Sequence, residues 1–276
     1  MFTLNCKGRL LTAEKPLVMG IINITPDSFY KESRIGERDA VLQKAEQMLR
    51  EGATILDIGG QSTRPGSNLV NEDEELERVV DHIDRLHQQL PEAVISIDTF
   101  YARVAAEAVA AGASIVNDVS GGVMDAAMLP VVAGLQTPFI CMHMKGTPQT
   151  MQQFAVYNNI TKEVLDYFIE RIAACRIAGI NDVIIDPGFG FAKTIDQNLK
   201  LLRELSLLKI MGKPILAGLS RKGTIYKTLG ITPDQALNGT TVLNTLALQN
   251  GADIVRVHDV KDAMEAVQLF CAYREA

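Results

Sequence analysis

The sequence contains no tryptophan, and aromatic residues make up only 5% of its 276 positions. A protein that binds mainly by stacking flat ligands on an exposed aromatic surface needs more such side chains. Positive charge is also scarce, because 27 lysines and arginines stand against 33 aspartates and glutamates, a net charge of −6. The composition therefore argues against nucleic acid as a partner, although it leaves room for a local basic site.

Cysteine is rare as well, and the four cysteines are spread along the chain without a Cys-x-x-Cys pair. This usage is typical of free thiols in a reducing compartment rather than of a disulfide framework or a zinc site. The N-terminal residues show no basic segment followed by a signal-type apolar core. One uncharged run, residues 126–144, approaches transmembrane length but contains Pro130, Gly134 and Pro138. We therefore expect a cytoplasmic protein without a membrane span.

The rest of the composition is that of a globular protein, with 47% hydrophobic and 22% charged residues. Three segments repeat one pattern, in which a helix-like stretch leads into Gly-Ala-x and a short apolar run; they begin at Gly52, Gly112 and Gly251. A glycine just past a helix end accepts the left-handed backbone that closes the last turn. The continuous apolar run that follows is typical of a parallel strand buried on both faces.

Extended over the whole chain, this pattern predicts eight strands, whose ends lie about 34 residues apart, alternating with helices. The predicted strands are Val18–Ile22, Ile55–Gly59, Val94–Asp98, Ile115–Asp118, Phe139–His143, Val183–Asp186, Ile215–Leu219 and Ile254–His258. Eight such units predict an α/β fold, a (β/α)₈ or TIM barrel, as a single domain over residues 1–276 with a short N-terminal hairpin at about Phe2–Arg9. A doubly wound open sheet is the alternative, but no Gly-x-Gly-x-x-Gly follows the first strand, which weakens a dinucleotide-binding interpretation.

Polar residues gather at the ends of these strands, where (β/α)₈ barrels place their active sites. A single Asp or Asn often only caps a helix or closes a turn, but polar ends on several strands together favour a binding site. A donor and acceptor set that suits a flat, nitrogen-rich heterocycle consists of Asn117, Asp186 and Lys222. A cationic and amide set that suits a phosphate or diphosphate consists of Asn23, Arg64, Arg256 and His258.

Glycine-rich loops follow several of the predicted strands. Residues 59–66 read Gly-Gly-Gln-Ser-Thr-Arg-Pro-Gly, in which the hydroxyl groups and Arg64 can meet anionic oxygens. Residues 187–191 read Pro-Gly-Phe-Gly-Phe, which lets the backbone approach a ligand beside two aromatic rings. Each loop alone is also compatible with an ordinary strand-to-helix turn, so it is their combination with the polar strand ends that favours a site.

Eight motifs run in order along nearly the whole chain: MGIINITPDSF, EGATILDIGGQSTRPG, ISIDT, IVNDVSGG, CMHMKGTP, DVIIDPGFGFAKT, GLSRK and ADIVRVHDV. In sequence, order and spacing they resemble the dihydropteroate synthase family of folate biosynthesis. The resemblance implies a transferase that joins 6-hydroxymethyl-7,8-dihydropterin diphosphate to 4-aminobenzoate, giving 7,8-dihydropteroate and diphosphate. It also implies inhibition by sulfonamides, which mimic 4-aminobenzoate.

The resemblance assigns roles to residues of the strand ends and loops. The implied pterin-binding residues are Asp98, Asn117, Met142, Asp186, Gly218, Lys222 and Arg256. The implied diphosphate-binding residues are Asn23, Thr63, Arg64, Arg256 and His258. The implied 4-aminobenzoate-binding residues are Phe29, Pro65, Phe189, Ser220 and Lys222. Mg²⁺ is the implied cofactor, with Asn23 as its ligand.

The resemblance further implies a homodimer, formed through outer helices such as Leu237–Gln249 or Met264–Tyr273. The sequence departs from the family at Gln61, where Glu is frequent, and at residues 30–33. Two alternatives would share the pterin-binding barrel, namely a methyltransferase domain that uses a methylated folate and a non-catalytic homologue. The Ser-Thr-Arg-Pro-Gly loop, Ser-Arg-Lys and Arg-x-His segments, all suited to a diphosphate, favour the synthase.

Overall fold

The computed structural model describes residues 1–24, 34–61 and 69–276. Its centre is a ring of eight parallel strands in the order β8-β7-β6-β5-β4-β3-β10-β9. The ring closes where Ile185 of β8 pairs with Ile215, just before β9. This arrangement confirms the predicted (β/α)₈ barrel. The strands of the ring are β3 (Leu17–Asn23), β4 (Ile55–Gly59), β5 (Val94–Asp98), β6 (Ile115–Asp118), β7 (Phe139–Met142), β8 (Val183–Asp186), β9 (Leu216–Ala217) and β10 (Ile254–Val257).

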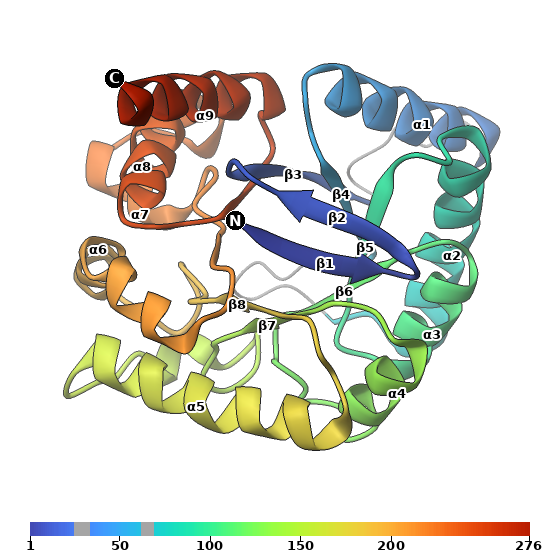
Figure 1. Ribbon diagram of the computed structural model, residues 1–276, viewed down its shortest axis with the longest axis horizontal. Helices are drawn as coiled ribbons and strands as arrows, with labels where there is room; N and C mark the ends of the chain where they lie inside the picture. Colours follow the sequence, from blue (N-terminus) through green and yellow to red (C-terminus); the bar gives the residue numbers. More distant parts are fainter. Residues whose placement is uncertain (25–33, 62–68) are drawn as a thin grey trace.

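Helices surround the ring on its outside (Figure 1). The α-helices are α1 (Arg34–Arg50), α2 (Glu72–Gln89), α3 (Ala102–Ala110), α4 (Met128–Leu135), α5 (Ile160–Ala178), α6 (Ile195–Arg203), α7 (Gly223–Leu229), α8 (Leu237–Gln249) and α9 (Val260–Glu275). Short 3₁₀ helices lie between some of them, namely η1 (Met151–Phe154), η2 (Leu205–Met211) and η3 (Pro233–Gln235).

The repeated glycines close helices as predicted. Gly52, Gly112 and Gly251 follow α1, α3 and α8 with φ angles of 104°, 123° and 97°. After Gly52, the Ala53 amide donates to the Met48 carbonyl at 2.9 Å, and the same bond to the carbonyl five residues earlier follows the other two glycines. This pattern satisfies carbonyls that the helix end would leave unpaired and turns the chain into the next strand.

A two-stranded antiparallel hairpin, β1 (Phe2–Cys6) and β2 (Arg9–Ala13), covers the amino-terminal end of the barrel (Figure 1). It reaches Ala13 rather than ending near Arg9 as predicted, because all five residues of β1 find partners in β2. Leu4 and Cys6 of the hairpin pack against one inward-facing apolar residue from each barrel strand: Met19, Ile55, Val94, Ile115, Ile140, Ile184, Leu216 and Ile254. The amino-terminal end is thus filled and covered, which leaves the carboxyl ends of the strands for a ligand.

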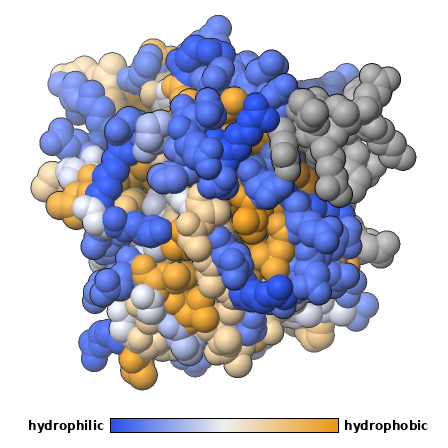
Figure 2. Space-filling model, turned by 90° about the vertical axis from the view of Figure 1, so that its right-hand side faces the viewer, coloured by the Kyte–Doolittle hydropathy of each residue, from blue (hydrophilic) through white to orange (hydrophobic). Residues whose placement is uncertain are grey.

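The predicted strands agree with the observed ones over most of their length. β4, β5, β6 and β8 have the predicted bounds, whereas β7 and β10 each end one residue earlier, and β9 is only two residues long. The shortened strands all end at the mouth of the barrel, where loops replace the ladder. Seen from the side that carries α2, α3 and α4 (Figure 2), hydrophilic side chains surround apolar patches. Over the described residues, no helix is both long enough and apolar enough to cross a membrane.

Candidate active site

The barrel brings most of the predicted polar strand ends into one row. Asn23, Gly59, Asp98 and Asn117 are consecutive register partners on β3, β4, β5 and β6. Asp186 of β8 pairs in the same way with Met142 of β7. Because side chains alternate along a strand, these positions share the inward face with the apolar residues at the bottom of the barrel. The row therefore lies at the carboxyl-terminal mouth.

Arg256 of β10 links two of these carboxylates across the mouth. Its Nε donates to Asp57 Oδ2 at 2.6 Å, and its Nη2 donates to Asp98 Oδ2 at 2.7 Å. Asn117 Nδ2 also donates to Asp57 Oδ2, at 3.1 Å. Charge-assisted bonds of this kind are strong and directional. They fix the guanidinium and the Asn117 amide before any ligand binds.

Asp57 is a member of the site that the sequence analysis missed. Its side chain is completely buried, and its Oδ1 atom has no hydrogen-bond partner among the described residues. Asp57 lies in the middle of β4, whereas the predicted site residues were taken from the ends of strands. Strand alternation would have found it, since Asp57 must face the barrel interior if Ile55 and Gly59 do. A lone carboxylate inside an apolar strand is a signal for a buried partner.

Burial and neighbouring charges set the protonation of this group. Burial raises the pKa of Asp98 to about 7; Arg256 opposes this rise, and the nearby Asp57 adds to it. Burial alone would lower the pKa of Arg256, but Asp57 and Asp98 more than offset it and hold that pKa above its ordinary value. The mouth therefore contains a permanent cation beside a carboxyl group that titrates near neutral pH.

Asp186 and Lys222 both bind the loop that follows β8. Asp186 Oδ1 accepts a hydrogen bond from the Gly188 amide at 2.7 Å. Lys222 Nζ donates to the Phe189 carbonyl at 2.5 Å and lies 4.7 Å from the centre of the Phe191 ring. Burial lowers the pKa of Lys222 to about 8, although the Asp186 carboxylate raises it. Burial also raises the pKa of Asp186, and Lys222 opposes that rise.

His258 is not the cation that the sequence analysis allowed for. Its Nδ1 lies 2.9 Å from Ser220 Oγ, and that oxygen also accepts from the His258 amide at 3.2 Å. Burial, reinforced by the nearby Arg256, lowers the pKa of His258 to about 4. The imidazole is therefore neutral at pH 7, and it can offer a hydrogen bond to an anion but no charge.

The two phenylalanines of the loop after β8 differ in position. The Phe189 ring is fully buried in the apolar cluster between the barrel and its helices, so only its backbone carbonyl reaches Lys222. The Phe191 ring belongs to a separate cluster with Met142 and lies next to Lys222. Phe191, rather than the expected Phe189, is thus the aromatic side chain of this loop that adjoins the predicted site.

Gly218 keeps space open at the mouth. A Cβ atom built on Gly218 would lie 3.6 Å from Lys222 Nζ and 4.0 Å from Arg256 Cβ, in ordinary contact with both.

Four predicted site residues, Phe29, Thr63, Arg64 and Pro65, lie outside the described residues.

Gln61 joins the end of β4 to the start of α2. Its Oε1 accepts from the Val70 amide at 3.1 Å, while its Nε2 donates to the Val70 carbonyl at 2.9 Å and to Glu75 Oε2 at 2.8 Å. Glu75 is fully buried, and burial raises its pKa to about 7, opposed by the hydrogen bond from Gln61. An amide at position 61 thus faces a buried carboxyl group without a second negative charge.

The described residues contain no group of three or more His, Cys, Asp or Glu side chains that could hold a metal ion. Asn23 offers one amide oxygen at the mouth, where a Cβ on Gly59 would lie 3.7 Å from both Asn23 Oδ1 and Asp98 Oδ2. Mg²⁺ commonly takes one or two protein ligands together with substrate phosphates and water. The donor set fits an ion that is bound largely through a diphosphate.

Residues 19–258 match the family described as pterin binding enzyme. The dihydropteroate synthase of Synechocystis sp. is 43% identical, and the match covers 95% of this chain and 90% of that relative. The folic acid synthesis protein fol1 of Schizosaccharomyces pombe is 44% identical over 94% of this chain, which spans only 36% of that relative.

Solved structures agree with these relatives. A dihydropteroate synthase of Xanthomonas albilineans with 4-aminobenzoic acid superposes with a TM-score of 0.92 at 41% identity, covering 99% of this chain and 98% of that one. The dihydropteroate synthase of Yersinia pestis in a sulfonamide drug complex also gives a TM-score of 0.92, at 39% identity and with 99% of each chain covered.

Proposed function

The chain belongs to the dihydropteroate synthases of the pterin-binding enzyme family, and we propose that it joins 6-hydroxymethyl-7,8-dihydropterin diphosphate to 4-aminobenzoate. The products are 7,8-dihydropteroate and diphosphate. The observation that carries this proposal is the arrangement at the mouth, in which Arg256 binds Asp57 and Asp98 while Asp186 and Lys222 both bind the backbone of the loop after β8. It supplies fixed donors and acceptors for a flat heterocycle in a chain that is similar to synthases over its whole length.

The pterin ring is assigned to the deep part of the mouth. Asp186 accepts hydrogen bonds from the amino and ring N–H groups, Asn117 pairs with another ring edge, and Lys222 donates to the ring carbonyl or N5 region. Arg256 lies against the ring, and Gly218 and Met142 leave room for it. This assignment rests on the buried, preorganised side chains of the site. A ligand that does not match their donors and acceptors would leave them unpaired, and the site would reject it.

The diphosphate is assigned to Asn23 and His258 with Thr63 and Arg64 of the loop after β4. The oxygen of Asn23 and the diphosphate oxygens would hold Mg²⁺, which, when bound, supplies positive charge to the departing diphosphate. 4-Aminobenzoate, and sulfonamides in its place, are assigned to Phe29, Pro65, Ser220 and Lys222, with Phe191 in the position expected of Phe189. Neutral His258 donates a hydrogen bond rather than charge.

The reaction exchanges one bond at the methylene carbon for another. The bond from this carbon to the diphosphate oxygen breaks, and its electron pair leaves with the diphosphate. The amine of 4-aminobenzoate then forms the new C–N bond with its lone pair and loses a proton to solvent. Positive charge that develops on the pterin methylene is stabilised by the Asp98 carboxylate and by the hydrogen bonds to the ring.

We also propose a single cytoplasmic domain that dimerises through its outer helices. Apolar side chains are exposed on neighbouring helices late in the chain: Leu229 of α7, Val242 and Leu246 of α8, and Leu269 and Tyr273 of α9. Such side chains support an apolar interface.

The test is a coupled assay of diphosphate release with both substrates and Mg²⁺. Release must depend on both the pterin diphosphate and 4-aminobenzoate, and Asp186→Ala should abolish it together with binding of 6-hydroxymethylpterin. Well-folded protein without turnover would refute the synthase activity, and methyl transfer from a methylated folate would favour the methyltransferase alternative. Unchanged pterin affinity in Asp186→Ala would refute the assigned pocket.

A further inference from the structure

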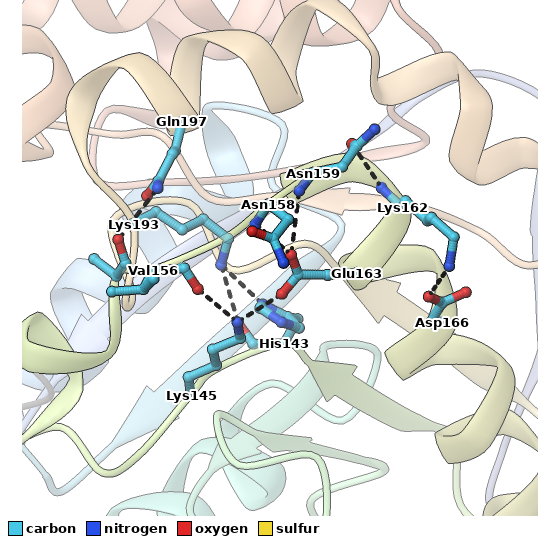
Figure 3. A network of polar contacts seen from close by, with 11 residues as sticks. His143, Lys145, Val156, Asn158, Asn159, Lys162, Glu163, Asp166, Lys193 and Gln197 are labelled. Carbon is cyan, nitrogen blue, oxygen red and sulfur yellow. Dashed lines mark hydrogen bonds and ion pairs between the residues drawn. The ribbon is translucent and has the colours of Figure 1, made fainter.

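Behind the pterin pocket, a lysine is buried in the loop between β8 and α6. Lys193 is only 4% exposed, and its Nζ contacts His143 Nδ1 at 3.0 Å, the Gly188 carbonyl at 2.9 Å and the Phe191 carbonyl at 3.0 Å. Figure 3 shows this side chain reaching His143 at the end of β7. The role that we assigned to the site does not use this group.

Four acceptors surround Nζ, because the His143 carbonyl also lies 3.3 Å away. Burial lowers the pKa of Lys193 well below its ordinary value and the Asp186 carboxylate opposes this, but the contacts are those of a charged ammonium group. Each partner offers a lone pair, and a neutral amine would turn its own lone pair toward one of them. The same geometry makes His143 a neutral imidazole that accepts at Nδ1. Burial lowers the pKa of His143 well below its ordinary value, and the Lys193 charge lowers it further.

Lys193 acts on the loop that carries the site. Gly188 is bound from both sides, since its carbonyl accepts from Lys193 and its amide donates to Asp186. With φ of +68° and a Cβ position only 2.1 Å from the His143 carbonyl oxygen, only glycine fits there. The loop then places the Phe189 carbonyl and the Phe191 ring beside Lys222.

We propose that Lys193 is a positioning residue of the pterin site: its buried amino group holds residues 188–191 against β7 and thereby keeps the Gly188 amide on the Asp186 carboxylate. The inference rests on the proposed function, because it assumes that ionised Asp186 receives the N–H groups of the pterin. Lys193 is one of the charges that lower the pKa of Asp186, against the larger effect of burial. Loss of its charge therefore moves the Asp186 pKa upward.

Among the described residues, the charged and titratable groups that face Lys193 lie on three segments of the chain. They are Asp186 on β8, Lys222 before α7, and His143 and Lys145 after β7. Lys145 provides a matched control. It lies in the same network (Figure 3), but its Nζ binds Glu163 Oε2 at 2.8 Å and the Val156 carbonyl at 2.9 Å, with its side chain 33% exposed.

The experiment measures binding of 6-hydroxymethylpterin by calorimetry between pH 5 and pH 8.5 in the unmodified protein, Lys193→Gln and Lys145→Gln. Affinity should fall as pH decreases through the Asp186 pKa, because the protonated carboxyl group loses an acceptor. In Lys193→Gln this fall should begin at a higher pH, because the Gly188 amide is no longer held on the carboxylate, so affinity at a fixed acidic pH should be severalfold lower. Lys145→Gln should follow the unmodified protein.

The outcomes separate the two ideas. If the unmodified protein does not bind the pterin, the proposed function is wrong. If it binds and the acidic fall in Lys193→Gln has the same midpoint, Lys193 has no effect on Asp186 and this inference is wrong, even if affinity drops equally at every pH.

A measurement without a variant covers the case in which Lys193→Gln does not fold. In ¹⁵N spectra of lysine side chains at pH 7, a buried ammonium with these acceptors should give a protected, slowly exchanging signal. Absence of any such protected ammonium would overturn the proposal.

Discussion

Replacing Arg256 with methionine would leave Asp57 and Asp98 without their common partner. The Arg256 side chain is 18% exposed, while the Asp57 and Asp98 side chains are 0% and 10% exposed, so water cannot replace the lost contacts. Removing one partner of a buried ion pair costs about 3–5 kcal/mol. We expect Arg256→Met to lower the free energy of unfolding by about this amount at pH 8.5, where the Asp98 carboxyl group would otherwise be ionised.

The same substitution should cost less at acidic pH. With Arg256 present, the pKa of Asp98 is already about 7, and loss of the guanidinium raises it further. The folded variant then holds a proton that the unfolded chain releases, so its stability falls as pH rises through this raised pKa. Each such proton contributes up to about 1.4 kcal/mol per pH unit. At pH 5.5 the cost should drop to about 1–3 kcal/mol, the value for lost hydrogen bonds.

Urea unfolding followed by circular dichroism at pH 5.5 and pH 8.5 measures both numbers. Arg85→Met is the control, because the Arg85 side chain is 34% exposed and its carboxylate partner, Asp39, is 50% exposed. It should cost about 1 kcal/mol or less, equally at both pH values. A cost of Arg256→Met that does not change with pH, or that is as small as the control, would refute the buried triad as described.

Three further predictions concern other parts of the site. Glu75→Gln should raise the free energy of unfolding by as much as about 3 kcal/mol at pH 8 and change it little at pH 5. The reason is that the pKa of Glu75 is about 7 in the folded protein, so ionisation of this buried carboxyl group destabilises the fold as pH rises from 4.5 through 7. Urea titrations at the two pH values measure the difference. Gly218→Ala should weaken binding of 6-hydroxymethylpterin about tenfold in calorimetry while the melting temperature hardly changes, since the new Cβ meets no atom closer than 3.6 Å but occupies ligand space. Binding of 4-aminobenzoate, measured by calorimetry, should weaken as pH rises through about 8, where Lys222 loses its charge, and Lys222→Arg should remove this pH dependence.

The barrel could be predicted from the sequence because its strands are buried on both faces and are mostly apolar. β4, β5, β6 and β8 were predicted with their observed bounds, and each is fully buried. The predicted hairpin was too short, because β2 spans only five residues and just one of them, Ala13, is buried. Short segments of this kind give a weak periodic signal.

For the candidate site, the sequence pattern predicts which residues are present but not how they pair or which of them are charged. The polar residues of the mouth could be predicted from strand ends, but their pairing could not, because Arg256 and Asp57 are 199 residues apart in the sequence. The choice between Phe189 and Phe191 depends on a loop in which Gly188 and Gly190 have positive φ, so no strand or helix period applies. The neutral state of His258 depends on burial and on Arg256, which the sequence does not show.

The charges at the mouth separate its two binding tasks. Asp57 and Asp98 already compensate the Arg256 guanidinium, the negative charge of Asp186 acts on Lys222, and His258 is neutral. These described residues offer many hydrogen bonds but little uncompensated positive charge, which suits an uncharged heterocycle better than an anion. The charge that a diphosphate requires must therefore come chiefly from outside this set, from the bound Mg²⁺ and from Arg64 in our proposal. Recognition of the ring and capture of the leaving group then depend on different residues, although both take place at one end of the same barrel.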